Sequence, residues 1–323
     1  MGCFIVLMKY GGERLFLQIT GGMHVIFSEL KEGSISLRYG ENPHEKAWVY
    51  GEPAFQLLHE GRRISYNNLL DADAAWAVAQ HLKDIAPFGA VALKHQTPCG
   101  VAVADTPEEA VRKAIDADAE SAYGGILAVN FPFTLSVAKS YKKYLEVIVA
   151  PEFTEEALAY LRKKKVRLIV PSRYDAFVGK PAFGALVVSE RILPPLEFQL
   201  QVGKPISDDV VMDMKLAYVA VEGAKSNAIV IVKNSVTVGI GTGQPSRKRS
   251  AWIATTLAGD KAHGAVAASD AFFPFPDGLE ILAEAGVSVV VAPLGSKRDN
   301  EVLKRAEELG ITFYSASSRV FRH

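Results

Sequence analysis

The chain has 323 residues, enough to bury more than one hydrophobic core, and this length predicts two domains. Hydrophobic residues make up 49% and charged residues 22%, a composition that is typical of folded proteins and argues against a disordered chain. Lys plus Arg and Asp plus Glu both number 36, so no net charge directs the protein to nucleic acid or to an anionic membrane. Any anion-binding site must therefore be local.

The first 35 residues predict a short leading segment. Its apolar start soon meets charged residues, and it is too short for a secretion signal or a membrane span. Alternating apolar and polar residues over positions 12–20 predict a strand. Cys3 and Cys99 are far apart in the chain and do not suggest a disulfide framework. These features favour a cytoplasmic protein without a membrane partner.

Short β-rich apolar runs alternate with helical runs along the rest of the chain. Residues 90–93 predict a strand, and residues 107–119 predict a helix with Pro107 in its first turn. Residues 147–150 predict another strand, and the helix after it begins at Thr154, a good N-cap residue. This alternation predicts an α/β architecture.

A weak internal repeat suggests that two related α/β lobes follow each other. Three matches occur in the same order: residues 94–103 with 225–232, residues 119–125 with 267–273, and residues 147–151 with 289–293. Chance similarity between buried strands that end in Ala-Pro is the alternative. Pro, Gly, Ser and Asp cluster over 171–184 and mark the junction, which gives lobes of 36–180 and 181–323.

Lys94 and His95 are the first candidates for chemistry. They follow the strand at 90–93 and precede a Pro-Cys-Gly turn, so we expect both at the carboxyl end of a strand, where open α/β sheets bind ligands. Histidine can transfer protons near neutral pH, and a neighbouring cation favours its neutral, basic form. A surface pair without function is the alternative.

Two segments of the second lobe contain polar or charged residues that could bind a ligand. Lys225-Ser-Asn-Ala228 places Asn227 where its amide could bind a carboxamide, although Ser-Asn also occurs in plain turns. Residues 241–249 combine glycines and three cations before a helix expected from Ser250, which suits phosphate or carboxylate. A solvated basic turn is the alternative, because the segment is neither a Walker loop nor a dinucleotide fingerprint.

Three further segments place polar groups beside apolar surface. These are residues 37–44, 66–71 and 269–277, and the three Phe of the last segment could line a slot for a flat ring or belong to the core. The sequence contains no Cys-x-x-Cys and no His-x-Glu, so it does not encode the zinc-bound water of nucleoside deaminases.

Taken together, these motifs resemble one family. The resemblance is to the AICAR (aminoimidazole carboxamide ribonucleotide) transformylase domain of the bifunctional purine biosynthesis proteins, from about Ser36 to His323. The motifs that carry it, in chain order, are Arg38-Tyr-Gly-Glu-Asn-Pro-His44, Asn68-Leu-Leu-Asp71, Lys94-His95, Ser121-Ala-Tyr-Gly-Gly125, Lys225-Ser-Asn-Ala228, Gly243-Gln-Pro-Ser-Arg247, Ser269-Asp-Ala-Phe-Phe-Pro-Phe275 and the terminal Arg319-Val-Phe-Arg-His323.

The resemblance implies a fold and an assembly. It implies two cytidine-deaminase-like α/β/α lobes in tandem without zinc, and a homodimer with active sites at its interface. Because only about 35 residues precede the first motif, we expect formyl transfer without the inosine monophosphate (IMP) cyclohydrolase activity of the bifunctional family.

The resemblance also implies the chemistry. The formyl group of 10-formyltetrahydrofolate, a co-substrate, would pass to the 5-amino group of AICAR to give FAICAR, with no catalytic metal. His95 would be the general base, Lys94 would stabilise the oxyanion or protonate the leaving nitrogen, and Asn227 would orient the reacting groups. The substrate-binding residues implied are Arg38, Tyr39, His44, Asn68, Tyr123, Gly124, Glu146, Arg247, Phe272, Asp277 and Arg319.

Some residues depart from the family pattern. Glu45 stands where Gln is usual, Thr97 where Asn is common, Tyr123 where Phe is frequent, and Glu146 where Asp is usual. The first three leave the formyl donor open, so formate activated by ATP is an alternative. A purine-nucleotide or folate sensor without catalysis is another, and a deaminase-like hydrolase is a remote one.

Overall fold

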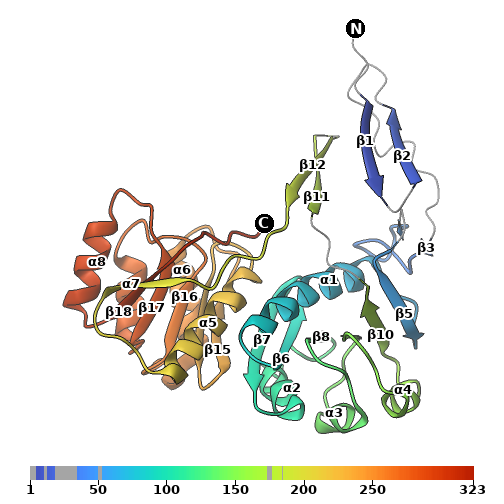
Figure 1. The fold of residues 1–323 in the computed structure, drawn as a ribbon, viewed down its shortest axis with the longest axis horizontal. Helices are drawn as coiled ribbons and strands as arrows, with labels where there is room; N and C mark the ends of the chain where they lie inside the picture. The colour runs from blue at the N-terminus through green and yellow to red at the C-terminus, as the bar shows by residue number, and fades with distance from the viewer. Residues whose placement is uncertain (1–4, 11–12, 19–34, 50–52, 173–176, 184) are drawn as a thin grey trace. The chain divides into compact units, whose positions relative to one another are not determined.

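The computed structural model describes residues 5–10, 13–18, 35–49, 53–172, 177–183 and 185–323 (Figure 1). The chain divides into two compact units. Unit 1 comprises Met1–Gln56, Arg63–Tyr66 and Pro171–Leu193, and unit 2 comprises Leu57–Arg62, Asn67–Val170 and Pro194–His323. The junction predicted at residues 171–184 falls in the last segment of unit 1.

Unit 1 contains small antiparallel sheets. Strand β1 (Ile5–Tyr10) pairs with β2 (Glu13–Gln18), which confirms the strand predicted at residues 12–20. Strand β3 (Ile35–Ser36) pairs with β4 (Trp48–Val49), and β11 (Phe177–Ala182) pairs with β12 (Ala185–Glu190).

Unit 2 is built on one mixed sheet of 12 strands, with helices along it, so the α/β class is confirmed. The strand order is β13-β18-β17-β16-β14-β15-β7-β6-β8-β9-β10-β5. The first half of the chain supplies β5 (Phe55–Glu60), β6 (Phe88–Lys94), β7 (Thr97–Ala104), β8 (Ile126–Val129), β9 (Val147–Val149) and β10 (Arg167–Pro171). The second half supplies β13 (Phe198–Val202), β14 (Ile229–Lys233), β15 (Val236–Gly241), β16 (Val266–Ser269), β17 (Val289–Pro293) and β18 (Thr312–Ala316).

The helices follow the same rhythm in both halves. The first half contains α1 (Tyr66–His81), α2 (Pro107–Asp116), α3 (Leu135–Ser140) and α4 (Glu155–Leu161). The second half contains α5 (Asp208–Glu222), α6 (Arg247–Ala258), α7 (Asp277–Glu284) and α8 (Asp299–Glu308). Short 3₁₀ turns, η1 (Leu82–Asp84) and η2 (Gly259–Ala262), follow α1 and α6.

One arrangement of elements thus occurs twice, as helix, hairpin, helix and then three strands separated by two helices. In both halves the hairpin strands are antiparallel, the first hairpin strand pairs antiparallel with the next strand, and the last three strands are parallel. We call residues 66–171 the first repeat and residues 208–316 the second repeat. The repeats meet where β15 pairs antiparallel with β7 at Val236 and Ala102.

The structure corrects the register of the sequence repeat. The match of residues 147–151 with 289–293 is confirmed, because these are β9 and β17. The match of Lys94 with Lys225 is wrong, since Lys94 ends β6 and its counterpart Lys233 ends β14. The match of 119–125 with 267–273 is also out of register, because residues 267–269 lie within β16 and residues 119–125 precede β8.

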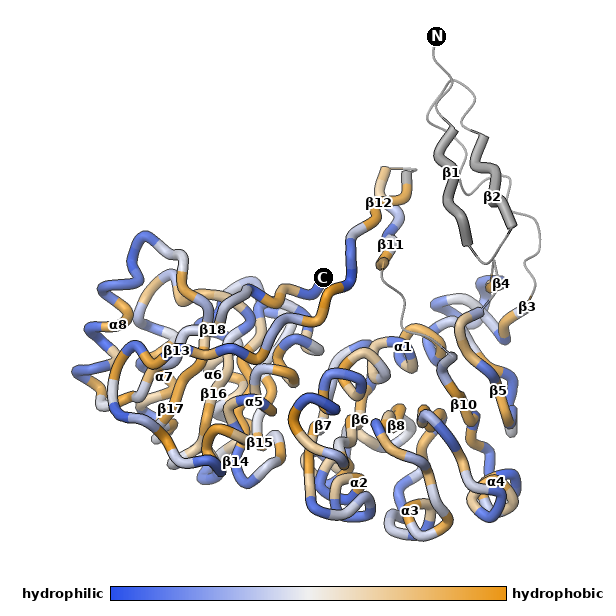
Figure 2. Tube along the Cα trace, in the orientation of Figure 1, coloured by the Kyte–Doolittle hydropathy of each residue, from blue (hydrophilic) through white to orange (hydrophobic). Residues whose placement is uncertain are grey.

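Each repeat has its own hydrophobic cluster between sheet and helices, formed by residues between 90 and 168 in one and between 229 and 313 in the other. The parallel strands β8, β9 and β17 are buried along their whole length, which explains their continuous apolar sequences (Figure 2). Helix starts follow local signals, because the Thr106 and Thr154 hydroxyls accept hydrogen bonds from the amides of Glu109 and Ala157.

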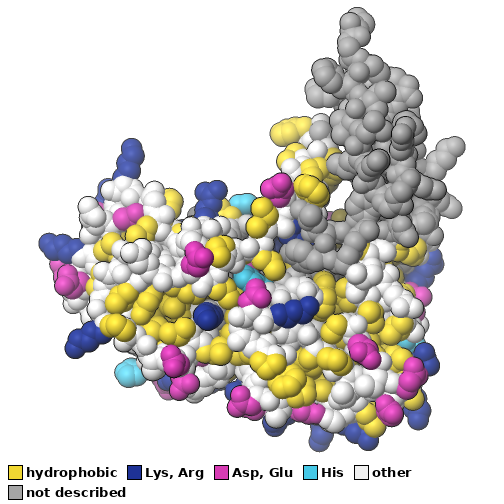
Figure 3. Space-filling model, viewed as in Figure 1, with side chains coloured by type: hydrophobic (Ala, Val, Ile, Leu, Met, Phe, Trp, Pro, Cys, Tyr) yellow, Lys and Arg dark blue, Asp and Glu magenta, His cyan; other side chains and the backbone are white. Residues whose placement is uncertain are grey.

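The surface matches the balanced composition. On the face drawn in Figure 3, acidic and basic side chains are interspersed among hydrophobic ones, and neither sign gathers into one patch. No helix in the described part of the chain is long and apolar enough to cross a membrane.

Candidate functional site

Lys94 and His95 lie at the tight turn between β6 and β7. Lys94 pairs with Thr97, so His95 and Gln96 alone form the turn, and both have positive φ, 54° and 59°. Two-residue hairpin turns with positive φ at both positions match the twist of the flanking strands, but they favour Asn and Gly. His95 is exposed.

The turn is held from outside the hairpin by Asp71 of α1. One carboxylate oxygen of Asp71 accepts the backbone N–H of His95 at 3.0 Å, and the other accepts that of Gln96 at 2.7 Å. Burial raises the pKa of the Asp71 carboxyl above its ordinary value, while these amide hydrogen bonds and the charges of His95 and Lys225 oppose the shift. Sequence reasoning placed Asp71 in a polar segment but assigned it no role.

The Lys94 ammonium faces the segment before β8. Its Nζ donates a hydrogen bond to the backbone oxygen of Tyr123 at 2.9 Å. Tyr123 is 58% exposed, and its ring lies 5.7 Å from that of Tyr144, while Gly124, at φ 72°, donates its N–H to the Tyr144 oxygen. Lys94 therefore holds the backbone beside two of the predicted binding residues.

Asn68 and Glu146 come together with a buried arginine. Asn68 Nδ2 donates to Glu146 Oε2 at 2.9 Å, and Arg167 Nη1 lies 3.4 Å from the same oxygen. Arg167 is only 1% exposed and also donates from Nε to the Arg62 oxygen at 2.7 Å. Arg167 was missed at the level of sequence, because an arginine that opens an apolar strand carries no motif.

Strand register places these groups along one edge of the sheet. Leu93 pairs with Ile126, Ile126 with Val147, and Val147 with Arg167. Lys94 is at the carboxyl end of β6, as expected. However, β8, β9 and β10 begin at this edge, so it carries the amino ends of the parallel strands, and the rule for carboxyl ends does not apply to them.

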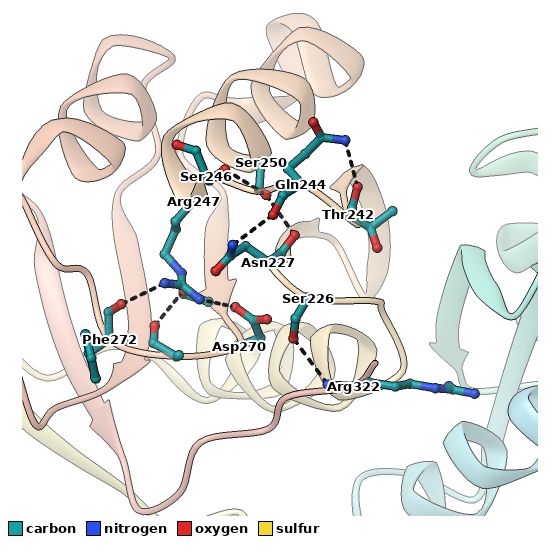
Figure 4. A network of polar contacts seen from close by, with 12 residues as sticks. Ser226, Asn227, Thr242, Gln244, Ser246, Arg247, Ser250, Asp270, Phe272 and Arg322 are labelled. Atoms are coloured by element: carbon teal, nitrogen blue, oxygen red, sulfur yellow. Dashed lines mark hydrogen bonds and ion pairs between the residues drawn. The ribbon is translucent and has the colours of Figure 1, made fainter. Parts of the chain in front are cut away.

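Asn227 is the centre of a hydrogen-bonded network in the second repeat (Figure 4). Its backbone N–H and its side-chain Nδ2 both donate to the Gln244 oxygen, at 3.0 and 2.8 Å. The Ser250 hydroxyl donates to the Asn227 backbone oxygen at 2.8 Å. The network ties the segment before β14 to the loop that leads into α6.

Arg247, the first residue of α6, points into the fold rather than to solvent. It is 8% exposed, and its Nη2 lies 2.5 Å from the Asp270 carboxylate while its Nη1 donates to the Phe272 oxygen at 3.0 Å (Figure 4). Asp270 is fully buried, and Asp270 Oδ2 and Arg247 Nε have no hydrogen-bond partner among the described residues. The predicted anion loop thus turns its first cation inward.

Asp277 and Arg319 lie on the surface of unit 2. Asp277 opens α7, accepts the N–H of Gly278 at 2.8 Å and lies 3.8 Å from Lys248 Nζ. Arg319 is exposed, and its guanidinium lies 4.6 Å from the centre of the Phe321 ring.

The terminal segment is anchored beside the Asn227 network. The Val320 N–H donates to the Asp270 oxygen at 2.9 Å, and the Arg322 N–H donates to the Ser226 hydroxyl at 3.2 Å. This position brings Arg319 to the region of Asn227 and Arg247.

Strand register also relates His95 to Asn227. Ala102 pairs with Val236, and the Val101 N–H donates to the Thr237 hydroxyl at 3.0 Å, so the antiparallel register carries the start of β7 toward the end of β15. That end, Gly241, pairs with Ile229, which follows Asn227 closely in the chain. The His95 turn and Asn227 therefore lie at the same edge of the 12-stranded sheet.

Arg38, Tyr39 and His44 belong to unit 1. The Arg38 guanidinium lies 5.0 Å from the centre of the Tyr39 ring. His44 is exposed beside Glu45, which accepts hydrogen bonds from the backbone N–H and Nδ2 of Asn42 at 3.1 and 2.9 Å. The hydrogen bond from the Asn42 side chain is the main cause of the lowered pKa of Glu45. Glu45 therefore closes this loop on itself.

Titratable side chains do not gather into a metal site in the part of the chain that the structure describes, where no group of three or more His, Cys, Asp or Glu could hold an ion. That the chemistry needs no metal remains a prediction.

Comparison with known proteins supplies the family. The model of the AICARFT/IMPCHase bienzyme family matches residues 18–257. The chain is 62% identical over 306 residues to the bifunctional purine biosynthesis protein PurH of Thermotoga maritima, covering 95% of this chain and 66% of the relative. It is 43% identical over 309 residues to the protein of the same description from Corynebacterium glutamicum, covering 90% of this chain and 58% of the relative.

The chain thus spans less than two thirds of the length of these relatives. Among solved structures, Acinetobacter baumannii RibD aligns at 22% identity over 29% of this chain and 30% of the RibD chain. Its TM-score of 0.24 is too low to indicate a common fold. The match to the family model extends over most of the chain, and the chain belongs to the AICARFT/IMPCHase bienzyme family.

Proposed function

We propose that this chain transfers the formyl group of 10-formyltetrahydrofolate to the 5-amino group of AICAR, giving FAICAR in purine biosynthesis. Membership of the family supports the reaction. The observation that carries the proposal is the placement of an exposed His95, with Lys94 beside it, at the sheet edge that also holds Asn227.

The 5-amino group of AICAR is a poor nucleophile. The 5-amino group is conjugated with the imidazole ring and its carboxamide, so it attacks the formyl carbon only as it loses a proton, and His95 would accept that proton. The new C–N bond forms as the bond from the formyl carbon to N10 of the folate breaks, and N10 then takes up a proton.

Lys94 and Asn227 would stabilise and orient this exchange. The Lys94 ammonium has three donors, and one of them is used by the Tyr123 oxygen, so others remain for the oxyanion or the leaving nitrogen. The amide of Asn227 is held through Nδ2 by Gln244, which leaves its oxygen as an acceptor for the amine or for the formyl C–H.

We propose that most of the remaining predicted residues bind the nucleotide or the folate. These are Arg38, Tyr39, His44, Asn68, Tyr123, Gly124, Glu146, Phe272, Asp277 and Arg319. Arg247 was predicted to bind substrate as well, but its guanidinium is already paired with Asp270, so we assign it to shaping the site.

The architecture enters the proposal as well. The repeated order of elements supports two related lobes, which we assign to 36–180 and 181–323. We propose, from the family alone, that both have a cytidine-deaminase-like fold and that they work without a catalytic metal. We propose a homodimer with active sites at its interface, in keeping with the family.

A steady-state assay tests the proposal. Purified protein and AICAR are supplied with 10-formyltetrahydrofolate in one arm and with formate plus ATP in the other, and products are separated by chromatography. FAICAR formed in the folate arm supports the proposal. FAICAR formed only with formate and ATP would identify another donor, and nucleotide binding without product in either arm would identify a sensor. The same traces test the expectation of a single step, because IMP formed without added cyclohydrolase contradicts it.

A further inference from the structure

The turn that carries His95 is formed by residues that do not favour it. His95 and Gln96 both have positive φ, and left-handed backbone is strained for a residue with a side chain. Asn and His are enriched in this conformation, but Gln is not. Neither residue is glycine, so the turn needs support from outside the hairpin.

Asp71 supplies that support through two hydrogen bonds to successive backbone amides, those of His95 and Gln96. The aspartate is 8% exposed and lies on α1, whose buried face packs into unit 2, so its carboxylate has a fixed position. Hydrogen bonds from backbone N–H groups to a carboxylate are stronger than those between neutral groups. The imidazole of His95 is therefore aimed from a backbone that α1 holds in place.

We infer that Asp71 is a positioning residue for formyl transfer, acting through the backbone of His95 without touching either substrate. The inference rests on the proposed function. A general base must lie within hydrogen-bond reach of the proton it removes, and small displacements of such a group lower the rate strongly. The role of Asp71 is accordingly to sustain kcat rather than to bind AICAR.

The second repeat offers a matched control. Asp213 of α5 accepts the N–H groups of Asn234 and Ser235, at 2.9 and 2.6 Å, at the two-residue turn between β14 and β15. These residues also have positive φ, 55° and 63°. Asp213 thus makes the same contact as Asp71 at a turn that has no residue of the proposed chemistry.

The test compares Asp71→Asn with Asp213→Asn. Asn keeps the size of the side chain but replaces one acceptor oxygen by an NH₂ donor. Each variant therefore loses one of the two hydrogen bonds that its side chain accepts from the backbone N–H groups of its turn. We expect amide hydrogen exchange to rise about tenfold or more at residues 95–96 in the first variant and at 234–235 in the second. We expect kcat for formyl transfer to fall at least about tenfold only in Asp71→Asn, with KM for AICAR within about threefold of the wild type.

Asp71→Glu is the second variant and guards against a misfolded Asp71→Asn. It keeps both acceptor oxygens on a longer side chain, so we expect its kcat to lie between that of Asp71→Asn and that of the wild type. Equal losses of kcat in Asp71→Asn and Asp213→Asn, or a loss confined to KM, would overturn the inference. If Asp71→Asn does not fold, wild-type kcat in Asp71→Glu together with raised exchange at 95–96 would overturn it. Wild-type protein that forms no FAICAR refutes the proposed function instead, and the positioning role with it.

Discussion

Lys94 and Lys233 make the same hydrogen bond in the two repeats. Each ends the first strand of its hairpin and donates from Nζ to a backbone oxygen. The acceptor is the Tyr123 oxygen shortly before β8, at 2.9 Å, in the first repeat, and the His263 oxygen shortly before β16, at 2.6 Å, in the second. The shared contact shows that this lysine position belongs to the fold. What distinguishes the first repeat is the residue that follows, His95 in place of Asn234. Equivalent residues of the two turns can therefore be substituted in parallel, with the first repeat as the test and the second as the control.

Replacing His95 by Ala removes the proposed base. We expect formyl transfer to fall by more than about a hundredfold, as is typical when a general base is lost, while AICAR still binds. The rate follows from the steady-state assay and the binding from calorimetry. Asn234→Ala is the control at the equivalent turn and should retain wild-type turnover. Unchanged turnover in His95→Ala would refute the proposed mechanism.

The Arg247–Asp270 pair should matter for stability, since it lies inside the fold. Asp270→Ala leaves the Arg247 guanidinium buried without its counter-charge, and we expect the free energy of unfolding to fall by about 3–5 kcal/mol. Asp277→Ala breaks the exposed pair with Lys248 and should cost less than about 1 kcal/mol. Urea unfolding followed by circular dichroism measures both. Similar losses in the two variants would show that burial of the first pair has no energetic weight.

Glycine is required where the helices approach the hairpins. An added Cβ at Gly100 would overlap the backbone oxygen of Ala114 in α2, and one at Gly239 would overlap that of Ala254 in α6. We expect Gly100→Ala and Gly239→Ala each to lower the free energy of unfolding by about 3 kcal/mol or more, because backbone must move.

Gly264→Ala is the comparison for these variants. Gly264 has φ +71° and nothing within 4 Å of an added Cβ, so only backbone strain of about 1–2 kcal/mol is expected. Thermal unfolding of the three variants under one condition gives the ranking. A Gly264→Ala variant as unstable as Gly100→Ala would contradict the argument from close approach.

Cys99 should be a slow thiol in the folded protein. Burial, and secondarily the charge of Asp118, raise its pKa to about 12, and its Sγ donates to the Ala92 oxygen at 3.4 Å. Only the thiolate reacts with disulfide reagents, so the reactive form is scarce at pH 8 and grows as the pH rises.

The measurement is labelling with Ellman's reagent at pH 8 in a Cys3→Ser background, so that the signal comes from Cys99. We expect native protein to react at least about a hundredfold more slowly than protein unfolded in urea. Equal rates under the two conditions would mean that the fold does not protect the thiol.

Local signals in the sequence were enough to predict several elements. Thr154 caps α4 as expected, because the N-cap hydrogen bond involves a residue only three positions away. The strand at 147–150 and its match at 289–293 were also recognised, since fully buried parallel strands consist of apolar residues without interruption. The family motifs pointed to Lys94, His95 and Asn227, and their roles in formyl transfer stay predictions.

What the sequence did not reveal depends on long-range contacts. Asp71 meets a turn 24 residues away, and Asn68 meets Glu146 78 residues away, distances over which no periodicity carries information. The helix expected from Ser250 begins at Arg247, and each helical residue adds about 100° of rotation. The face of Arg247 could therefore not be assigned from the motif, and the structure shows that it points inward.

Asp71 on α1 and Asp213 on α5 stabilise the conformation of the two hairpin turns, which in other hairpins depends on the turn residues themselves. A turn that is stabilised from a neighbouring helix can change its own side chains while its shape is maintained. Such a turn can carry His95 in the first repeat and Asn234 in the second without a change of shape. The catalytic role proposed for His95 thus has a conformational precondition, and that precondition is present in both repeats.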